Sequence, residues 1–111
     1  MNLKESIKSK TSDFLALCKS HNVSSLHAFG SSVNENFDEN SSDIDLLIEI
    51  DKHDPIERGE SLMNIWDQFE SFFERKVDLL TSSSIKNPIL KKNIDSTKVL
   101  IYDGKKRKVF I

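Results

Sequence analysis

The sequence predicts a single α/β domain in which helices cover a mixed sheet of three or four strands. Segments with helical spacing of apolar residues alternate with short apolar segments typical of strands, in the order α-β-β-α-β-α-β. The composition agrees with a globular protein rather than a disordered one, since 37% of the 111 residues are hydrophobic and 31% are charged. A chain of this length has room for one core, so residues 1–111 are predicted to form one domain.

The first half of the chain contains one predicted helix, two strands and the loop between them. Apolar residues recur at helical spacing in residues 2–20, which predicts an amphipathic helix. Residues 25–30 are a short strand candidate closed by a glycine. Residues 32–42 are rich in Asn, Ser and acidic residues, a composition typical of a loop. The second strand is predicted at residues 43–50.

The second half begins with the strongest helix signal of the chain. Asp54 can cap the helix, and Pro55 suits its first position, so the helix is predicted over residues 55–74. On it, Trp66, Phe69 and Phe73 share one face and are predicted to lie in the core, whereas Phe72 falls off that face. An exposed Phe72 would be a candidate contact for a partner protein. The remaining elements are predicted to be a strand, a turn, a short helix and a last strand, at residues 75–81, 82–84, 88–94 and 98–102.

Charge and cysteine content exclude several classes of protein. The formal net charge of −2 argues against direct, general nucleic-acid binding. The single cysteine, Cys18, excludes an intramolecular disulfide and a cysteine zinc site, and fits a reducing compartment. The chain has no signal-peptide pattern and no apolar stretch long enough for a membrane span, so we expect a cytoplasmic protein that does not contact membranes. The basic run at residues 105–108 is interpreted as a solvated end, with a docking or nucleic-acid patch as the alternative.

The most informative feature is the pair Asp43 and Asp45 at the start of an apolar strand. Alternate residues of a strand point to the same face, with Cα atoms roughly 6.5 Å apart. Two carboxylates about 5 Å apart repel by on the order of 3 kcal/mol at an effective dielectric constant near 20. The neighbouring residues of this strand offer no Lys or Arg. A hard divalent cation such as Mg²⁺ would neutralise the pair, because it prefers carboxylate oxygens together with substrate phosphates.

Two further motifs extend this candidate metal site. Asp78 is a third carboxylate within an apolar strand, and it converges with Asp43 and Asp45 if the two strands are neighbours in the sheet. It could then accept a proton from an attacking hydroxyl in metal-assisted phosphoryl transfer. Gly30 and Ser31 follow a strand, where the glycine lets the backbone approach a phosphate and the hydroxyl can donate to it. The alternative is that the three acids are a strand cap and a solvated face, and that Gly30 is only a turn.

These motifs resemble those of a known family. Phe29-Gly30-Ser31, then residues 42–47 (Ser-Asp-Ile-Asp-Leu-Leu) and 76–81 (Lys-Val-Asp-Leu-Leu-Thr), are similar to the minimal nucleotidyltransferase (MntA-like) group of the polymerase-beta-type nucleotidyltransferase superfamily. The resemblance covers roughly residues 1–103 and implies a nucleotidyltransferase fold, a mixed sheet flanked by helices. It also implies Mg²⁺-dependent transfer of a nucleoside monophosphate, usually from ATP as co-substrate.

The resemblance implies a role for each motif residue. Gly30 and Ser31 would hold the triphosphate, Asp43 and Asp45 would bind the metal, and Asp78 would assist the acceptor hydroxyl. One segment departs from the family pattern: Arg-x-Arg-Gly commonly follows the Gly-Ser pair, whereas this chain reads Ser-Val-Asn-Glu at residues 32–35. The loss of two cations there is expected to weaken triphosphate binding, because charge-assisted hydrogen bonds to phosphate are the strong ones.

The resemblance further implies a protein partner. In this group the partner is commonly a HEPN-domain toxin, an RNase, and the small transferase is its antitoxin, which transfers AMP to a tyrosine of the toxin. A hetero-oligomer with such a toxin is therefore expected. Two other functions are open: an inactive antitoxin that inhibits by binding alone, or an enzyme that modifies a small hydroxyl compound such as an aminoglycoside.

Overall fold

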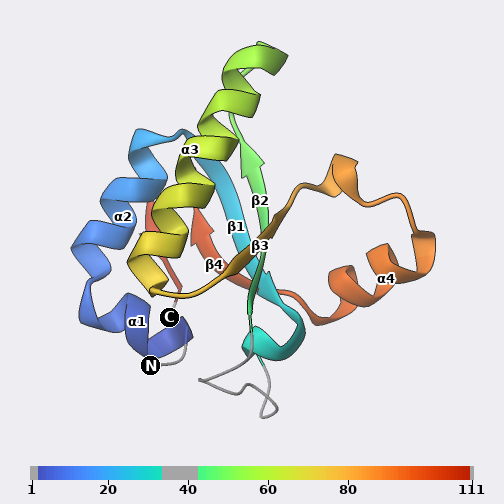
Figure 1. Cartoon of the computed structure of the whole chain (residues 1–111), viewed down its shortest axis with the longest axis horizontal. Helices are drawn as coiled ribbons and strands as arrows, with labels where there is room; N and C mark the ends of the chain where they lie inside the picture. Colours follow the sequence, from blue (N-terminus) through green and yellow to red (C-terminus); the bar gives the residue numbers. More distant parts are fainter. Residues whose placement is uncertain (1–2, 34–42, 111) are drawn as a thin grey trace.

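A five-stranded mixed sheet forms the centre of the computed structural model, which describes residues 3–33 and 43–110 (Figure 1). The strands are β1 (Val23–Phe29), β2 (Ile44–Ile50), β3 (Val77–Leu80), β4 (Val99–Asp103) and β5 (Lys108–Val109). The helices are α1 (Leu3–Ser9), α2 (Thr11–Ser20), α3 (Pro55–Phe73) and α4 (Pro88–Thr97), with short 3-10 turns η1 (Gly30–Val33) and η2 (Ser82–Ser84). The mixed α and β architecture predicted from the sequence is confirmed.

The strand order is β3-β2-β1-β4-β5, and β2 and β3 form the parallel pair of the sheet. All other neighbouring pairs are antiparallel. Parallel neighbours need a long crossover connection, and α3 provides it between β2 and β3. The sheet has one strand more than the three or four expected, because Lys108, the last residue of the basic run, and the following Val109 pair with β4. The side chains of residues 105–108 are all exposed, which agrees with the interpretation as a solvated end, although the backbone of Lys108 belongs to β5.

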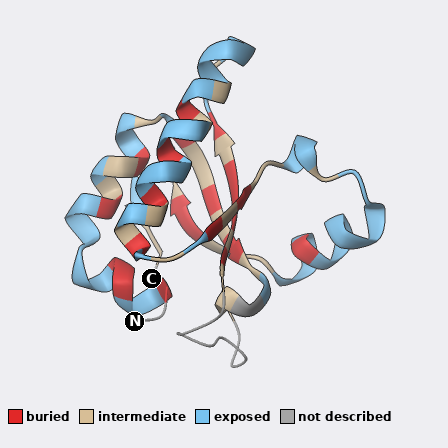
Figure 2. Ribbon diagram, viewed as in Figure 1, coloured by how far each residue is buried: buried red, intermediate tan, exposed pale blue. Residues whose placement is uncertain are grey.

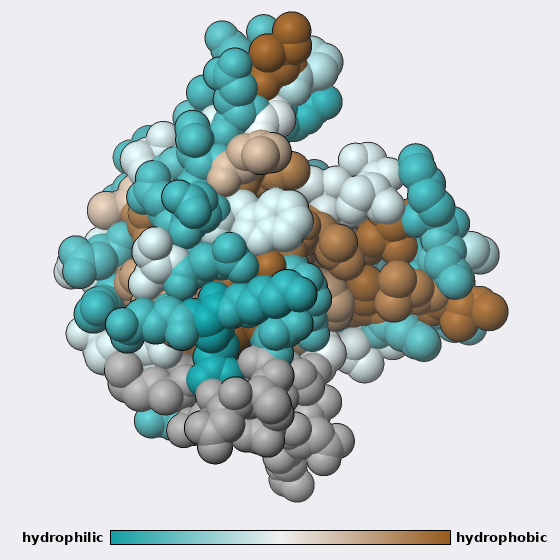
Figure 3. All heavy atoms as spheres, in the orientation of Figure 1, coloured by the Kyte–Doolittle hydropathy of each residue, from teal (hydrophilic) through white to brown (hydrophobic). Residues whose placement is uncertain are grey.

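The helices lie on the two faces of the sheet in unequal numbers. Figure 2 shows that α1, α2 and α3 turn buried residues toward the sheet, whereas α4 stands apart and is mostly exposed. Ile94 is the one residue of α4 that is buried, and Ile89 and Leu90 are exposed. A hydrophobic surface is correspondingly visible around α4 in Figure 3. The face of the sheet away from α1, α2 and α3 is called the open face below.

The core is centred on aromatic residues between α2 and α3. Phe14 of α2 is fully buried, and its ring centroid lies 5.9 Å from that of Phe69 and 6.2 Å from that of Phe73. Phe72 is half-buried and also packs on Phe14, at 5.5 Å, so the exposure that would make it a candidate partner contact is not observed. Trp66 was expected in the core but is 36% exposed, with its Nε1 donating to the carbonyl oxygen of Val77 at 2.7 Å.

Element boundaries differ from the expectations at a few places. The helix expected over residues 2–20 is divided at Lys10, whose φ of −139° is not helical. The side chains around the break compete for the helix carbonyls: Ser9 Oγ donates to the carbonyl oxygen of Ser6, and Thr11 Oγ1 to that of Ile7. The helix predicted over residues 55–74 is confirmed, with the Asp54 side chain accepting from the Ile56 N–H. Helix α4 is three residues longer than expected, since it reaches Thr97 rather than residue 94.

The structure also describes the surroundings of the single cysteine and the apolar character of the helices. Cys18 is fully buried, and burial raises the pKa of its thiol to about 12, so the thiol remains protonated. Within residues 3–33 and 43–110, no helix combines the length and the apolar character that crossing a bilayer requires. The loop expected at residues 32–42 lies mostly outside the described residues, which include only residues 32 and 33 of it.

We expect Phe14→Ala to lower the free energy of unfolding by about 3–5 kcal/mol, because the ring contacts three other aromatic side chains and the cavity would not refill. Chemical denaturation followed by circular dichroism measures this loss. The control is Met63→Ala, because Met63 is 70% exposed on α3 and its truncation should change stability by less than about 0.5 kcal/mol. Equal losses in the two variants would contradict the assignment of the core.

Candidate active site

The strand register places Asp45 directly beside Asp78. In the parallel pair, Asp45 of β2 is the partner of Asp78 of β3, and in the antiparallel pair it is the partner of Phe29 of β1. Along β2, Ile44 and Leu46 are buried in the core, whereas Asp45 is half-buried and lies on the open face. Asp78 likewise alternates with the buried Val77 and Leu79. Two of the three predicted acids therefore lie next to each other on one face of the sheet.

Contacts from α3 fix the position of β3 and hence of Asp78. The backbone N–H of Val77 donates to Glu70 Oε2 at 3.0 Å, and its carbonyl accepts from Trp66 Nε1. At the start of β2, the N–H of Ile44 donates to the carbonyl oxygen of Lys76 at 3.1 Å. The residue before Asp78 is thus held from the helix side, while the carboxyl group itself faces away from α3.

Electrostatics show that the three carboxyl groups interact. The pKa of Asp45 is raised to about 6, first by burial, then by the charge of Asp78 and a hydrogen bond with it, and finally by the charge of Asp43. A hydrogen bond between two carboxyl groups requires that one of them carries a proton. The charges of Asp78 and Asp43 thus make loss of the Asp45 proton unfavourable, and negative charge is in excess around this residue.

Gly30 forms the wall of this acidic site. It has φ of +63°, a left-handed conformation that glycine adopts without steric cost. A Cβ atom placed on it would lie 2.6 Å from Asp45 Oδ2, so a side chain at this position would collide with the carboxylate. The turn η1, which contains Gly30 and Ser31, consequently begins directly against the acids. The predicted phosphate motif and the predicted metal ligands are adjacent in space.

Ser32 is a site residue that the sequence reasoning missed. Its Oγ accepts a hydrogen bond from the backbone N–H of Asp45 at 2.8 Å and so ties η1 to β2. In the sequence, Ser32 is recognisable only as the start of the altered loop. The available signal was its place just after the Gly30-Ser31 pair, from which a short hydroxyl side chain can reach a backbone N–H of the adjoining strand.

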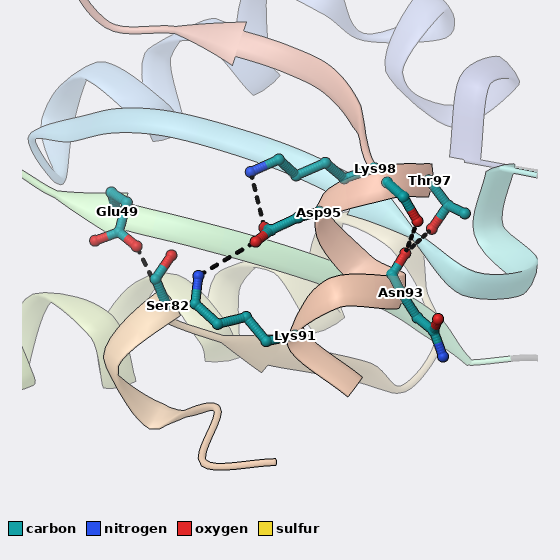
Figure 4. Close-up of polar contacts among 8 residues, drawn as sticks. Glu49, Ser82, Lys91, Asn93, Asp95, Thr97 and Lys98 are labelled. Carbon is teal, nitrogen blue, oxygen red and sulfur yellow. Dashed lines mark hydrogen bonds and ion pairs between the residues drawn. The ribbon is translucent and has the colours of Figure 1, made fainter. Parts of the chain in front are cut away.

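The open face also carries one cation from α4 and one from the residue that follows this helix. Asp95 accepts hydrogen bonds from Lys91 Nζ and Lys98 Nζ, both at 3.2 Å, and Figure 4 shows this cluster in front of the sheet. The pKa of His27, which lies on β1, is lowered first by burial and then by Lys98, with Asp95 acting in the opposite sense. The charge of Lys98 thus acts on a side chain of the sheet, that of His27. Neither lysine had been singled out from the sequence.

The donor set fits a divalent cation. Asp43, Asp45 and Asp78 offer hard carboxylate oxygens, and a cation would relieve the repulsion that raises the pKa of Asp45. In the described part of the chain, no group of three or more His, Cys, Asp or Glu side chains is arranged to hold a metal ion. A cation here would therefore use one or two carboxylates and take its other ligands from water or phosphate oxygens, as Mg²⁺ commonly does.

Comparison with known proteins identifies the family. A family model described as "Polymerase beta, Nucleotidyltransferase" matches residues 13–107. The chain belongs to this nucleotidyltransferase family. The nucleotidyltransferase is also 36% identical over 85 residues to a protein of Methanocaldococcus jannaschii named "Putative protein adenylyltransferase MJ0126", covering 77% of this chain and 83% of the relative.

Solved structures share the fold. A structure described as a "putative minimal nucleotidyltransferase" has a TM-score of 0.61 and 21% identity, with 89% of this chain and 95% of that chain covered. A toxin–antitoxin structure with AMP-PNP has a TM-score of 0.62 and 18% identity, with 85% and 73% covered. The complex of tri-AMPylated Shewanella oneidensis HEPN toxin with MNT antitoxin has a TM-score of 0.53 and 18% identity, with 89% and 74% covered.

In the metal-free protein, we expect Asp45 to destabilise the fold as the pH rises. Its folded-state pKa of about 6 lies above the usual 3.8, so the folded state binds the proton more tightly. The resulting stability is complete below about pH 4 and is lost as the pH rises through 6. After allowance for solvent screening, Asp45→Asn should be more stable than wild type by about 1–2 kcal/mol at pH 7 and equal near pH 4. Denaturation in EDTA at both pH values measures this, with the exposed Asp67→Asn as the control.

We expect Gly30→Ala to distort the site, because its Cβ would meet the Asp45 carboxylate and the residue would keep a left-handed conformation. The predicted loss in free energy of unfolding is about 1–3 kcal/mol. The matched control is Gly59→Ala on α3, where a Cβ has no neighbour within 4 Å and alanine favours the helix. A Gly30→Ala variant as stable as Gly59→Ala would show that Gly30 is an ordinary turn residue.

Proposed function

We propose that this nucleotidyltransferase transfers AMP from ATP, with Mg²⁺, to a tyrosine hydroxyl of a HEPN-type RNase toxin, and acts as its antitoxin in the cytoplasm. The observation that carries the proposal is the pairing of Asp45 with Asp78, with Asp43 in electrostatic contact and Gly30 against the same carboxylate. Carboxylates placed in this way can supply oxygen ligands to the metal ion that metal-assisted phosphoryl transfer uses. We further propose that residues 1–111 form one minimal nucleotidyltransferase domain.

Each residue has a distinct role in the proposed reaction. Asp43 and Asp45 hold the metal, which when bound neutralises charge on the triphosphate. Gly30 and Ser31 hold the triphosphate, whose oxygens can approach the backbone of η1 because Gly30 has no side chain. Asp78 takes the proton of the acceptor hydroxyl. The hydroxyl oxygen forms a bond to the α-phosphorus of ATP, the bond to the β-phosphate breaks, and pyrophosphate leaves.

The relatives support the choice of acceptor. The M. jannaschii relative is named a protein adenylyltransferase, and three solved structures that share the fold are described as toxin–antitoxin complexes or as a toxin carrying AMP. These solved structures resemble this chain in their fold. We extend their described partner and modification to this chain because its acidic site lies on the open face, where an acceptor can approach.

The altered segment at residues 32–35 lacks the two arginines of the family pattern. We propose that Lys91 of α4 and Lys98, which directly follows α4, compensate for them. Both are held by Asp95 on the open face, so their ammonium groups are positioned and can attract a polyphosphate. The same altered segment supports a second candidate function, in which the protein inhibits its toxin by binding without transfer.

We expect Asp43→Asn and Asp45→Asn each to lower the transfer of labelled AMP to the toxin by more than about 100-fold, because each removes a carboxylate from the metal site. Asp78→Asn should lower kcat by about 10²–10⁴-fold while changing the Mg²⁺ requirement less, as expected for a general base. The assay incubates labelled ATP, Mg²⁺ and toxin, with Asp67→Asn as the control that keeps full activity.

The same assay separates the two candidate functions. Toxin that is inhibited by the wild-type protein without any label would contradict the enzymatic proposal and favour inhibition by binding. Wild-type transfer by both Asp43→Asn and Asp45→Asn would overturn the metal-site assignment. Circular dichroism of each variant confirms that the loss of activity is not a loss of fold.

A further inference from the structure

The end of the sheet opposite the acids contains a second candidate site. A cavity of about 780 Å³ lies where α2 leads into β1 and where the β4–β5 hairpin turns. Its lining includes Lys19, Lys105 and Arg107, with Asp51 as the acidic member. The register separates it from the acidic site, since the cavity adjoins Val23 at the start of β1 and Asp45 pairs with Phe29 at the end of that strand.

Lys19 comes from α2, Lys105 and Arg107 come from the turn between β4 and β5, and none of the three is neutralised. In residues 3–33 and 43–110, the side chains of Lys19, Lys105 and Arg107 make no hydrogen bond and no ion pair. Asp51 lines the same cavity but is not within ion-pair distance of them. The cavity therefore carries three positive charges and one negative charge. A cleft lined mainly by one sign of charge raises the local concentration of oppositely charged ligands.

Backbone contacts hold this site rigidly. Gly104 begins the hairpin turn, and its N–H donates to the carbonyl oxygen of Ser24 at 2.8 Å. A Cβ on Gly104 would lie 2.4 Å from the Val23 carbonyl oxygen, so the turn is pressed against β1. Asp103 Oδ1 accepts from the Lys105 N–H at 2.9 Å and fixes the next residue of the turn. The cationic side chains thus project from an ordered frame.

Arg107 occupies a strained position in this frame. Its φ is +49°, in the left-handed region that costs a residue with a Cβ about 1 kcal/mol or more. Glycine would be the favoured residue there on conformational grounds alone. The charge of Arg107 acts on the hydroxyl of Tyr102, a buried residue that also lines the cavity. A strained arginine whose side chain reaches the cavity fits a binding role better than a role in the turn.

We propose that this cavity, formed around Lys19, Lys105 and Arg107, binds the phosphate chain of a small polyphosphate, free or carried by a nucleotide. A guanidinium group binds phosphate oxygens in a bidentate manner, and ammonium groups supply further charge. The lining has three positive charges and one negative charge, and its positive net charge attracts a phosphate chain. The volume lies within the range of small-molecule pockets. The basic run of the sequence, which the proposed transfer reaction does not use, thereby acquires a role.

The test uses inorganic tripolyphosphate as the probe, with the full chain in EDTA at low ionic strength. EDTA removes the divalent cation that the acidic site needs for a triphosphate, and a loss of binding in Lys105→Gln but not in Lys106→Gln assigns the remaining signal to this cavity rather than to Lys91 and Lys98 on the open face. We expect wild-type binding that weakens with added salt and that is unchanged in the Asp43→Asn/Asp45→Asn double variant. Lys105→Gln should weaken binding at least fivefold. The matched control is Lys106→Gln, since Lys106 lies in the same turn, faces the Phe110 ring and is not in the lining, so binding should change less than twofold.

Two variants separate binding from folding. Arg107→Gly removes the guanidinium group and the strain together, so we expect binding to weaken at least fivefold while the Tm stays equal or rises. Asp51→Asn removes the negative charge of the lining and should strengthen binding at least twofold. Absence of wild-type binding, equal loss in Lys105→Gln and Lys106→Gln, or weaker binding by Asp51→Asn would each overturn the proposal. Titration with ATP in EDTA distinguishes the ligands: affinity equal to that of tripolyphosphate assigns the phosphate chain alone, and higher affinity assigns a nucleotide.

Discussion

The parallel pairing of β2 with β3 is the constraint on which the site depends. It sets Asp45 and Asp78 side by side, an arrangement that costs free energy because burial and the charge of Asp78 both oppose ionisation of Asp45. The rest of the molecule resists their separation. Helix α3 makes the parallel connection, its Trp66 and Glu70 bind the backbone of Val77, and the aromatic core anchors α3 to α2. The fold thus stabilises a charge cluster that would be unfavourable in an isolated pair of strands.

Much of this arrangement could be predicted from the sequence, and the reason is periodicity. Alternation of apolar residues around Asp45 and Asp78 located both strands and both acids, and Asp54 with Pro55 located the start of α3. The sequence could not show whether the two strands are neighbours in the sheet, because strand order is decided by long-range pairing. The proximity of Gly30 to Asp45 also depends on tertiary contact, although the glycine at position 30 indicated a close approach of the backbone to another group.

The features that could not be predicted depend on side chains that compete for backbone hydrogen bonds or on residues that are exposed. The break at Lys10 arises because Ser9 and Thr11 hydroxyls bind helix carbonyls, which apolar spacing does not report. Strand β5 is only two residues long and lies in a basic run, so no strand pattern could reveal it. Trp66 has helical spacing suited to the core, yet its indole N–H needs the carbonyl of Val77, which keeps the ring at the surface.

The two edges of the sheet limit how other proteins can engage it. Among the described residues, the edge strands are β3, with four residues, and β5, with two. Edges so short offer few unpaired backbone groups for an added strand, and Lys108 places a charge on one of them. Extension of the sheet by a partner strand is therefore disfavoured, as is edge-to-edge aggregation. Recognition of this protein by others must rely on side chains of its faces and helices, where single substitutions can change specificity without changing the fold.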